Sequence, residues 1–337
     1  MKERLFLIVA FLISWGIELA LLLTGHVDDA IYNWISPLIA FGPALAVLVT
    51  KYVIKEPLGM NLWFKPEGRK TLKYVLAGWF GPLIPIAVGV CVYFLIFHNQ
   101  FDSGMGAMIE SLRGQNDLSS YSDAQIRSTL YRTIIINILM SPFYNIFTCV
   151  TEEFGWRGYL LNALCEHHPK WRAVLLNGVL WGIWYIPLAA MQTFAGKSYD
   201  GNLVLGVIYL VVYAMIYSIV FAAIYSYLTL KTHSCVPAIL ANACITSMGN
   251  VGLLFMKEQG KVNTYLNPTN TSIIGGIGFI LLAVLIFYLL AKDKVEPAPM
   301  KEEVANMKRM DEVAKRAKNR SGSLKSHTQN EHLKEGR

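Results

Sequence analysis

Long apolar runs separated by short polar loops are the main pattern along this chain. A bilayer core about 30 Å thick is crossed by roughly 20 residues of helix, and about eight runs reach that length. They cover about residues 5–24, 34–54, 73–97, 132–154, 173–192, 203–229, 235–256 and 272–291. The pattern therefore predicts an all-α fold, a polytopic membrane helical bundle with about eight transmembrane helices.

Composition agrees with a membrane protein. Hydrophobic residues make up 54% of the chain and charged residues only 16%, whereas soluble domains carry about 25% charged residues. The net charge of +7 is explained by basic loops beside the spans. We therefore expect membrane lipid around the chain and no nucleic-acid partner.

Basic residues concentrate in alternate loops, which sets the expected orientation. By the positive-inside rule these loops face the cytoplasm, so both termini should be cytoplasmic, in what we expect to be a bacterial plasma membrane. Arg113, Arg127 and Arg132, in a long polar loop at about 98–131, are the exception. The basic positions are Lys2, Arg4, Lys51, Lys55, Lys65, Arg69, Lys70, Lys73, Lys170, Arg172 and Lys231, with more after residue 292.

Two adjacent carboxylates, Glu152 and Glu153, stand inside apolar sequence with Arg157 close behind. Ionised side chains at membrane depth are costly and need partners. On a helix Glu153 and Arg157 share a face, which makes the arginine the natural counter-ion. Glu152 points about 100° away and is a candidate general base for water. A simpler alternative is a structural ion pair near the headgroups with the other glutamate solvated.

Three segments carry a resemblance to a known family. Glu152–Leu160, with its Glu-Glu pair and Gly-Trp-Arg-Gly, resembles the first motif of the CPBP family. Trp181–Leu188 is similar to the second motif, and Ser234–Asn242, continued to Thr246, to the last. This family comprises intramembrane, metal-independent glutamic endopeptidases, among them CAAX prenyl protease 2, bacteriocin-processing and lysostaphin-resistance-like proteins. The resemblance covers about residues 140–250.

The resemblance implies a catalytic site, and this sequence departs from the family's pattern at several positions of that site. The first glutamate of the family, here Glu152, activates water with a histidine, while a second histidine and an asparagine stabilise the oxyanion. Tyr185 stands where the second motif has histidine, and Asn242 and Thr246 stand where the last motif has histidine and asparagine. Tyr185 and Asn242 remain hydrogen-bond donors, but neither exchanges a proton near pH 7 as histidine does. The candidate site residues are Glu152, Glu153, Arg157, Tyr185, Asn242 and Thr246.

No cofactor or metal is expected, because no HExxH-type spacing accompanies the glutamates and the five cysteines lack CxxC spacing. No GxSxG motif suggests a serine hydrolase. We divide the chain into N-terminal transmembrane helices with a polar loop, the CAAX-protease-like core, a last transmembrane helix and a charged cytoplasmic tail. The boundaries are 1–130, 131–256, 257–291 and 292–337.

The leading functional prediction is hydrolysis of peptide bonds in membrane-associated peptides or prenylated proteins, with Glu152 as base. The alternative is a catalytically impaired pseudoprotease that serves as a peptide-binding, bacteriocin-immunity or partner-protein scaffold in the membrane. Loss of both histidines favours the alternative, and retention of Glu152 and Arg157 favours the enzyme. A small-solute transporter is a weaker prediction, because polar residues are not spread over several spans.

Overall fold

The computed structural model describes residues 2–27, 30–57, 62–64, 71–194, 203–258 and 265–293. Throughout these ranges the regular structure is helical, apart from one isolated antiparallel bridge between Phe101 and Met256. The all-α prediction is confirmed. The charged tail from residue 294 onward and the basic loop positions Lys65, Arg69 and Lys70 lie outside the described residues. The domain boundaries stay predictions.

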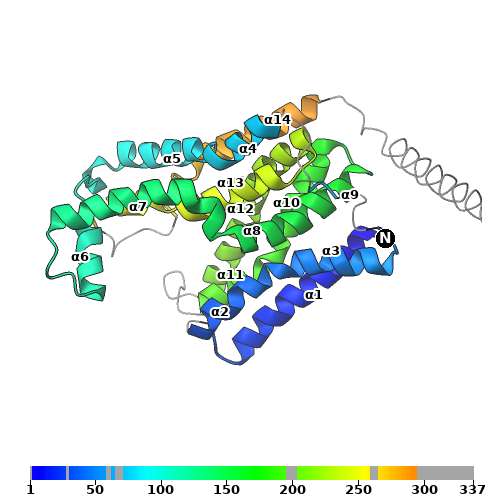
Figure 1. The fold of residues 1–337 in the computed structure, drawn as a ribbon, viewed down its shortest axis with the longest axis horizontal. Helices are drawn as coiled ribbons and strands as arrows, with labels where there is room; N and C mark the ends of the chain where they lie inside the picture. Colours follow the sequence, from blue (N-terminus) through cyan, green and yellow to red (C-terminus); the bar gives the residue numbers. More distant parts are fainter. Residues whose placement is uncertain are drawn as a thin grey trace, which may run out of the picture. The chain divides into compact units, whose positions relative to one another are not determined.

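Several of the apolar runs are divided between two shorter helices, so the helices outnumber the runs (Figure 1). In chain order they are α1 (Lys2–Leu23), α2 (Ala30–Ile39), α3 (Phe41–Val53), α4 (Thr71–Phe80), α5 (Leu83–Ile96), η1 (His98–Gln100), α6 (Gly106–Gln115), α7 (Asp123–Tyr144), α8 (Ile146–Glu153), η2 (Phe154–Leu160), α9 (Leu161–Cys165), α10 (Lys170–Trp184), α11 (Ile186–Phe194), α12 (Leu203–Thr232), α13 (Val236–Met248), η3 (Val251–Phe255) and α14 (Ile277–Lys292).

Several of these helices are long and apolar enough to cross a bilayer, so the chain is an integral membrane protein. Within the described ranges five qualify, and a bent pair formed by α7 with α8–α9 brings the number to six. The expected count of about eight is not confirmed. The run expected at 173–192 is divided between α10 and α11, and α14 has only 16 residues. The five are Lys2–Leu23, Ala30–Val53, Thr71–Ile96, Gly206–Thr232 and Val236–Phe255.

The helix expected at 132–154 begins earlier than predicted and is broken into α7 and α8. It starts at Asp123, because Ser122 and Gln125 form a reciprocal capping box. Near its end Pro142 lacks the N–H that would bind the carbonyl of Ile138, and the Trp79 indole donates to that carbonyl at 3.0 Å instead. The axis then turns by 52°. This bend directs α8 and its glutamates into the bundle.

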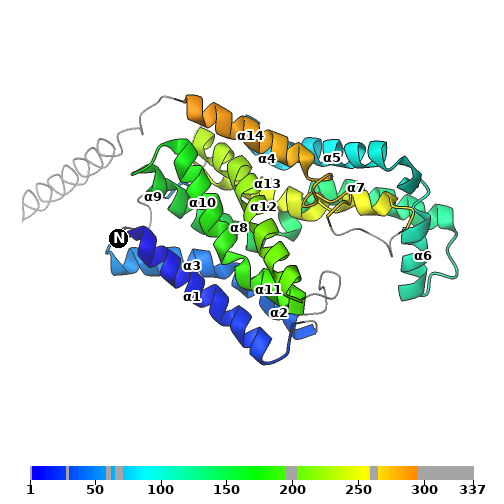
Figure 2. The ribbon, with the colours of Figure 1, turned by 180° about the vertical axis from the view of Figure 1, so that it is seen from behind.

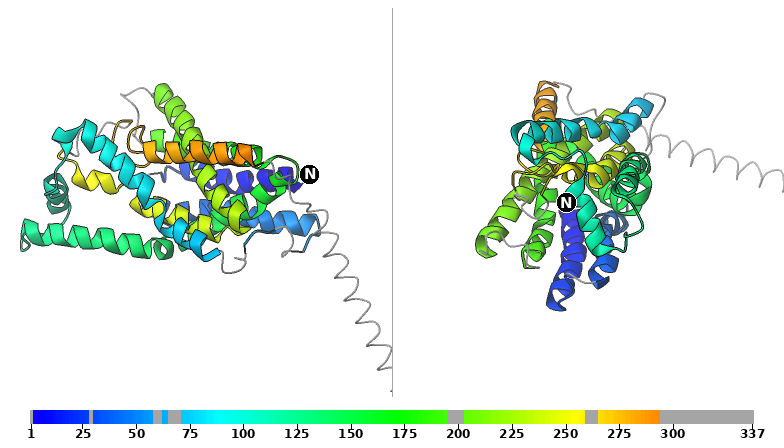
Figure 3. Two further views of the ribbon diagram at one scale, coloured as in Figure 1. Left: turned by 90° about the horizontal axis from the view of Figure 1, so that it is seen from above. Right: turned by 90° about the vertical axis from the view of Figure 1, so that its left-hand side faces the viewer.

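The bundle is built around α12 and α13, and α8, which carries the glutamates, packs against α13 and α3. α10 runs along α12, α1 runs along α3, and α13 packs against α4, α7, α8 and α12 (Figures 1 and 2). At the far end of α7 from α8, α6 packs on the first turns of α7 (Figures 1 and 3). The Asn145 amide at the bend donates to the Ser247 hydroxyl at 2.8 Å and ties the bend to α13.

A glycine allows α13 to approach α4. A Cβ on Gly78 would lie 2.2 Å from the carbonyl oxygen of Pro237, well inside contact distance. Small residues at such crossings let membrane helices pack closely. Any side chain at position 78 would push α13, and with it Asn242, away from α4.

We therefore expect Gly78→Ala to lower the free energy of unfolding by about 1–3 kcal/mol through overpacking. Gly114→Ala is the matched control, because no atom lies within 4 Å of its added Cβ; as a helix position it should be neutral or stabilised by up to about 1 kcal/mol. Thermal unfolding of both purified variants in one detergent measures the difference. Equal stability of Gly78→Ala and the parent would contradict the close crossing of α4 and α13.

Candidate active site

The two glutamates end α8 and are followed at once by the π-helical turn η2. A π-helix is wider than an α-helix, is rare, and is frequent at functional sites. Gly155 lets this wide turn lie against α3, because a Cβ there would be 2.4 Å from the Cβ of Pro43. The local sequence thus presses the acidic pair against neighbouring helices.

Glu153 and Arg157 form a completely buried ion pair, as their four-residue spacing predicts. Both side chains are 0% exposed, and Arg157 Nη1 donates to Glu153 Oε1 at 3.1 Å. The guanidinium also lies 4.1 Å from the ring centre of Trp181 and 5.0 Å from that of Tyr225. These cation–π contacts add to the stabilisation of a charge held away from water.

Residues of the third motif, on α13, contact the Glu153–Arg157 ion pair. Asn242 Nδ2 donates to Glu153 Oε1 at 2.9 Å, and the Thr246 hydroxyl donates to Asn242 Oδ1 at 3.3 Å. Thr246 therefore orients the amide of Asn242 with its NH₂ group toward the acid. One hydrogen of that NH₂ group serves Glu153, and the second remains for another acceptor.

Glu152 lies on a different face and has a different partner. It is half-buried, and the Tyr185 hydroxyl donates to Glu152 Oε2 at 3.4 Å, a long hydrogen bond. Tyr185 caps the C-terminal end of α10. Its ring packs edge-on against the rings of Trp181 and Trp184, with centroids 5.4 and 4.9 Å away.

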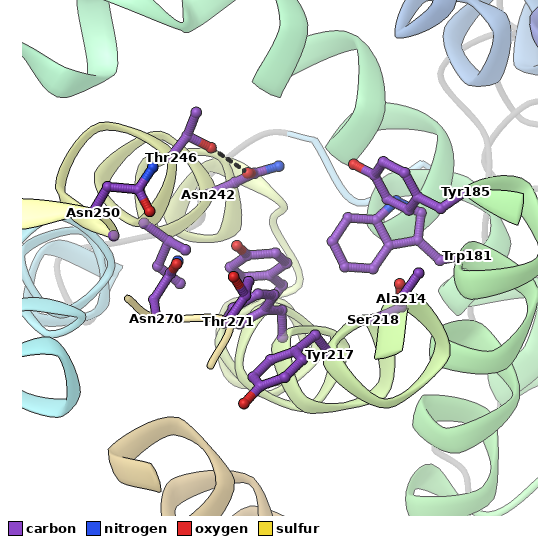
Figure 4. Close-up of a pocket in the computed structure, with 14 residues that line it drawn as sticks. Trp181, Tyr185, Ala214, Tyr217, Ser218, Asn242, Thr246, Asn250, Asn270 and Thr271 are labelled. Carbon is purple, nitrogen blue, oxygen red and sulfur yellow. Dashed lines mark hydrogen bonds between the residues drawn. The ribbon is translucent and has the colours of Figure 1, made fainter. Parts of the chain in front are cut away.

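A cavity of about 370 Å³ opens beside these groups, within the size range of ligand pockets. Tyr185 and Trp181 line one side of it and Asn242 and Thr246 the other (Figure 4). Among the described residues, Glu152, Glu153 and Arg157 do not line it. They form a layer behind it, connected to the lining through Tyr185 and Asn242.

The structure brings all six predicted residues into this one region, and the cavity adds residues that the sequence analysis missed. The added lining residues include Tyr217, Tyr225, Asn250, Asn270 and Thr271, none of which is among the candidate site residues predicted from the sequence. Asn270 and Thr271 lie in a turn segment, 265–276, that precedes α14. Their only sequence signal is a run of Asn, Thr, Ser and Pro, which an ordinary surface loop would share.

No histidine lines the cavity among the residues that the structure describes. His233 packs on the ring of Trp63 with a centroid distance of 5.0 Å. His167 is 65% exposed and lies near Glu3. No cluster of three or more His, Cys, Asp or Glu side chains suited to a metal ion occurs among the residues described.

Comparison with known proteins matches the same region. Residues 134–248 fit the family of Rce1-like type II CAAX prenyl endopeptidases. Over 147 residues the chain is 25% identical to CAAX prenyl protease 2 of Methanococcus maripaludis, an alignment that covers 43% of this chain and 48% of the archaeal protein. The chain thus matches about half the length of this curated relative. Over this region the chain is similar to the CPBP family, and within it to the Rce1-like CAAX proteases.

Removing the buried cation tests the centre of the site. Arg157→Met leaves the Glu153 carboxylate buried without its counter-ion, so we expect the free energy of unfolding to fall by about 3–5 kcal/mol. Glu153→Gln in the same chain should recover a large part of that loss, because the acid is then neutral while Asn242 keeps an acceptor. Chemical unfolding in mixed micelles gives the four values of the cycle. Strictly additive effects would mean that the two charges do not interact.

Proposed function

We propose that this protein is an intramembrane endopeptidase that hydrolyses a peptide bond in membrane-associated peptides or prenylated proteins, with Glu152 as general base. The observation that carries the proposal is a ligand-sized cavity lined by Tyr185 and Asn242, whose side chains donate hydrogen bonds to Glu152 and Glu153 behind it. Similarity to CAAX prenyl endopeptidases over residues 134–248 supports the same reaction class. We expect no metal or cofactor in this reaction.

The proposed reaction needs only water and the peptide. Glu152 takes a proton from water as the water oxygen forms a bond to the carbonyl carbon. Once Glu152 is protonated, the Tyr185 hydroxyl can turn its one hydrogen from that carboxyl group to the oxyanion that develops. The free amide hydrogen of Asn242 donates to the same oxyanion. The C–N bond then breaks, and protonated Glu152 returns its proton to the leaving amine. Glu153, held by Arg157, fixes Asn242 and takes no part in proton transfer.

Ion pairs at one end of the bundle support an orientation with both termini in the cytoplasm. Lys2 pairs with Glu166, and Lys170 pairs with Asp293. The start of α1, the loop after α9 and the end of α14 are therefore close together, which requires an even number of crossings between them. Basic side chains at this end fit the positive-inside rule, in the plasma membrane of a bacterial cell.

A second candidate function is a pseudoprotease that binds a peptide, a bacteriocin or a membrane partner protein without cutting it. Tyr185 and Asn242 favour it, because neither side chain gains or loses a proton near neutral pH as histidine does. Their contacts with Glu152 and Glu153 hold the cavity in shape whether or not a bond is broken.

A cleavage assay separates the two candidates. The substrate is a fluorophore–quencher peptide with a farnesylated cysteine followed by three residues, incubated with the purified chain in nanodiscs. We expect cleavage by the parent and a rate loss of about 10²–10⁴ for Glu152→Gln, the usual contribution of a general base. Glu110→Gln, an exposed position on α6, is the control and should cleave at the parent rate.

The pseudoprotease would give the opposite pattern. The parent would bind the peptide and leave it intact, while Tyr185→His combined with Asn242→His would create cleavage. That result would contradict the enzymatic proposal.

Removing the Tyr185 hydroxyl tests its role as a donor. Tyr185→Phe keeps the ring contacts with Trp181 and Trp184, so we expect unchanged thermal stability. Loss of one oxyanion donor typically lowers kcat by about 10²–10³, and we expect a loss of that order with little change in KM. A kcat equal to that of the parent would remove Tyr185 from the mechanism and leave it a packing residue.

A further inference from the structure

The cavity has a second, polar end that the proposed reaction does not use. Thr246 and Asn250 line it one helical turn apart, and Asn270 and Thr271 face them from the turn segment 265–276 (Figure 4). The other end is lined by aromatic rings, among them Trp181, Phe221 and Tyr225. The cavity is therefore divided into an apolar half and a half lined by amides and hydroxyls.

Three of the polar side chains have unused hydrogen-bonding capacity. Asn250, Asn270 and Thr271 make no side-chain hydrogen bond with any residue that the structure describes. Asn270 is buried, with 9% of its surface exposed, whereas Thr271 is half-buried and Asn250 is exposed. Buried amides are nearly always hydrogen-bonded. Nearby polar groups do find partners: Thr269 Oγ1 donates to Asn267 Oδ1 at 2.6 Å.

The segment that carries Asn270 is fixed in position. The Asn270 backbone N–H donates to the carbonyl of Gly249 at 2.9 Å, and the Tyr217 hydroxyl donates to the carbonyl of Ser272 at 2.6 Å. Gly249 has no side chain, and a Cβ there would lie 2.3 Å from Asn270 Nδ2. The amide of Asn270 is thus held at the cavity wall before any ligand binds.

The chemistry of the wall selects the ligand. Within the described ranges no charged side chain lines the cavity, so a carboxylate or phosphate would enter without a counter-ion, at a high cost. A carboxamide offers both N–H donors and a C=O acceptor. The complementary neutral ligand is another amide, such as the main chain of a peptide.

We propose that Asn250, Asn270 and Thr271 form a subsite that binds main-chain amides of an internal, uncharged segment of the peptide substrate. The subsite lies next to Asn242 and Thr246, so it would align the chain beside the bond to be cut. The inference rests on the proposed function for the peptide nature of the ligand. It adds the position of the peptide backbone and the preference for an internal segment over a free carboxyl terminus.

The experiment measures binding separately from cleavage. The full chain with Glu152→Gln is placed in nanodiscs and titrated against a fluorescein-labelled, farnesylated peptide that ends in a carboxamide. A parallel set of peptides replaces one main-chain amide at a time by an ester, which removes the N–H donor. Fluorescence anisotropy gives Kd for each pair of protein and peptide.

We expect Asn270→Ala to weaken binding of the all-amide peptide about five- to tenfold, the usual effect of one or two hydrogen bonds. With one of the ester peptides Asn270→Ala should leave Kd unchanged, because that peptide already lacks the N–H group that donates to Asn270. Thr271→Val, which keeps the side-chain shape, should behave alike and serves if Asn270→Ala fails to fold. Asn99→Ala, an exposed position in η1, is the control and should bind as the parent does.

Three results would separate this inference from the proposed function. Equal Kd values for the parent, Asn270→Ala and Thr271→Val with every peptide overturn the subsite, even if Glu152-dependent cleavage is found. A free-acid peptide whose binding depends on Asn270 more than that of the carboxamide peptide overturns the main-chain assignment. The Asn270→Ala effect on Kd could disappear with one ester peptide while the parent protein cleaves no substrate. That result would support the subsite and contradict the proposed peptidase activity.

Discussion

A charged pair with no access to water, Glu153 with Arg157, sets the conditions for the rest of this structure. In a low-dielectric interior such a pair persists only when its geometry is good and further hydrogen bonds satisfy its atoms. Here Asn242 supplies an amide from α13, and the rings of Trp181 and Tyr225 cover the guanidinium from α10 and α12. Four helical segments must therefore meet at one point, and the cavity lies where they meet.

This arrangement divides the site into two layers. The inner layer is the ion pair, which is inaccessible and structural in its effect. The outer layer consists of Tyr185, Asn242 and Thr246, which line the cavity and are oriented by hydrogen bonds to the acids or to each other. The family resemblance predicts histidines in the outer layer, where this chain has Tyr185 and Asn242. The acidic residues that the resemblance predicts for the inner layer are present in this chain. A tyrosine and an asparagine keep the hydrogen-bonding geometry while giving up proton exchange near neutral pH.

The sequence alone predicts the buried ion pair and the helical membrane bundle. Spacing alone predicted the Glu153–Arg157 pair, since side chains four apart on a helix are neighbours, and apolar length predicted the membrane bundle. Hydropathy did not reveal the bend at Asn145, which depends on Pro142 and on a hydrogen bond from Trp79. It also placed the start of the last span at 272, whereas α14 begins at Ile277. Asn270 was missed because its burial depends on contacts with Gly249 that are distant in sequence.

In the proposed reaction, water activated by Glu152 adds to a peptide carbonyl in the cavity. The isotopic mass of the product formed by the parent chain in H₂¹⁸O tests this step most directly. We expect an amino-terminal fragment whose new carboxyl group carries one ¹⁸O. An intact peptide after prolonged incubation, or a fragment whose new carboxyl group contains no ¹⁸O, would contradict it.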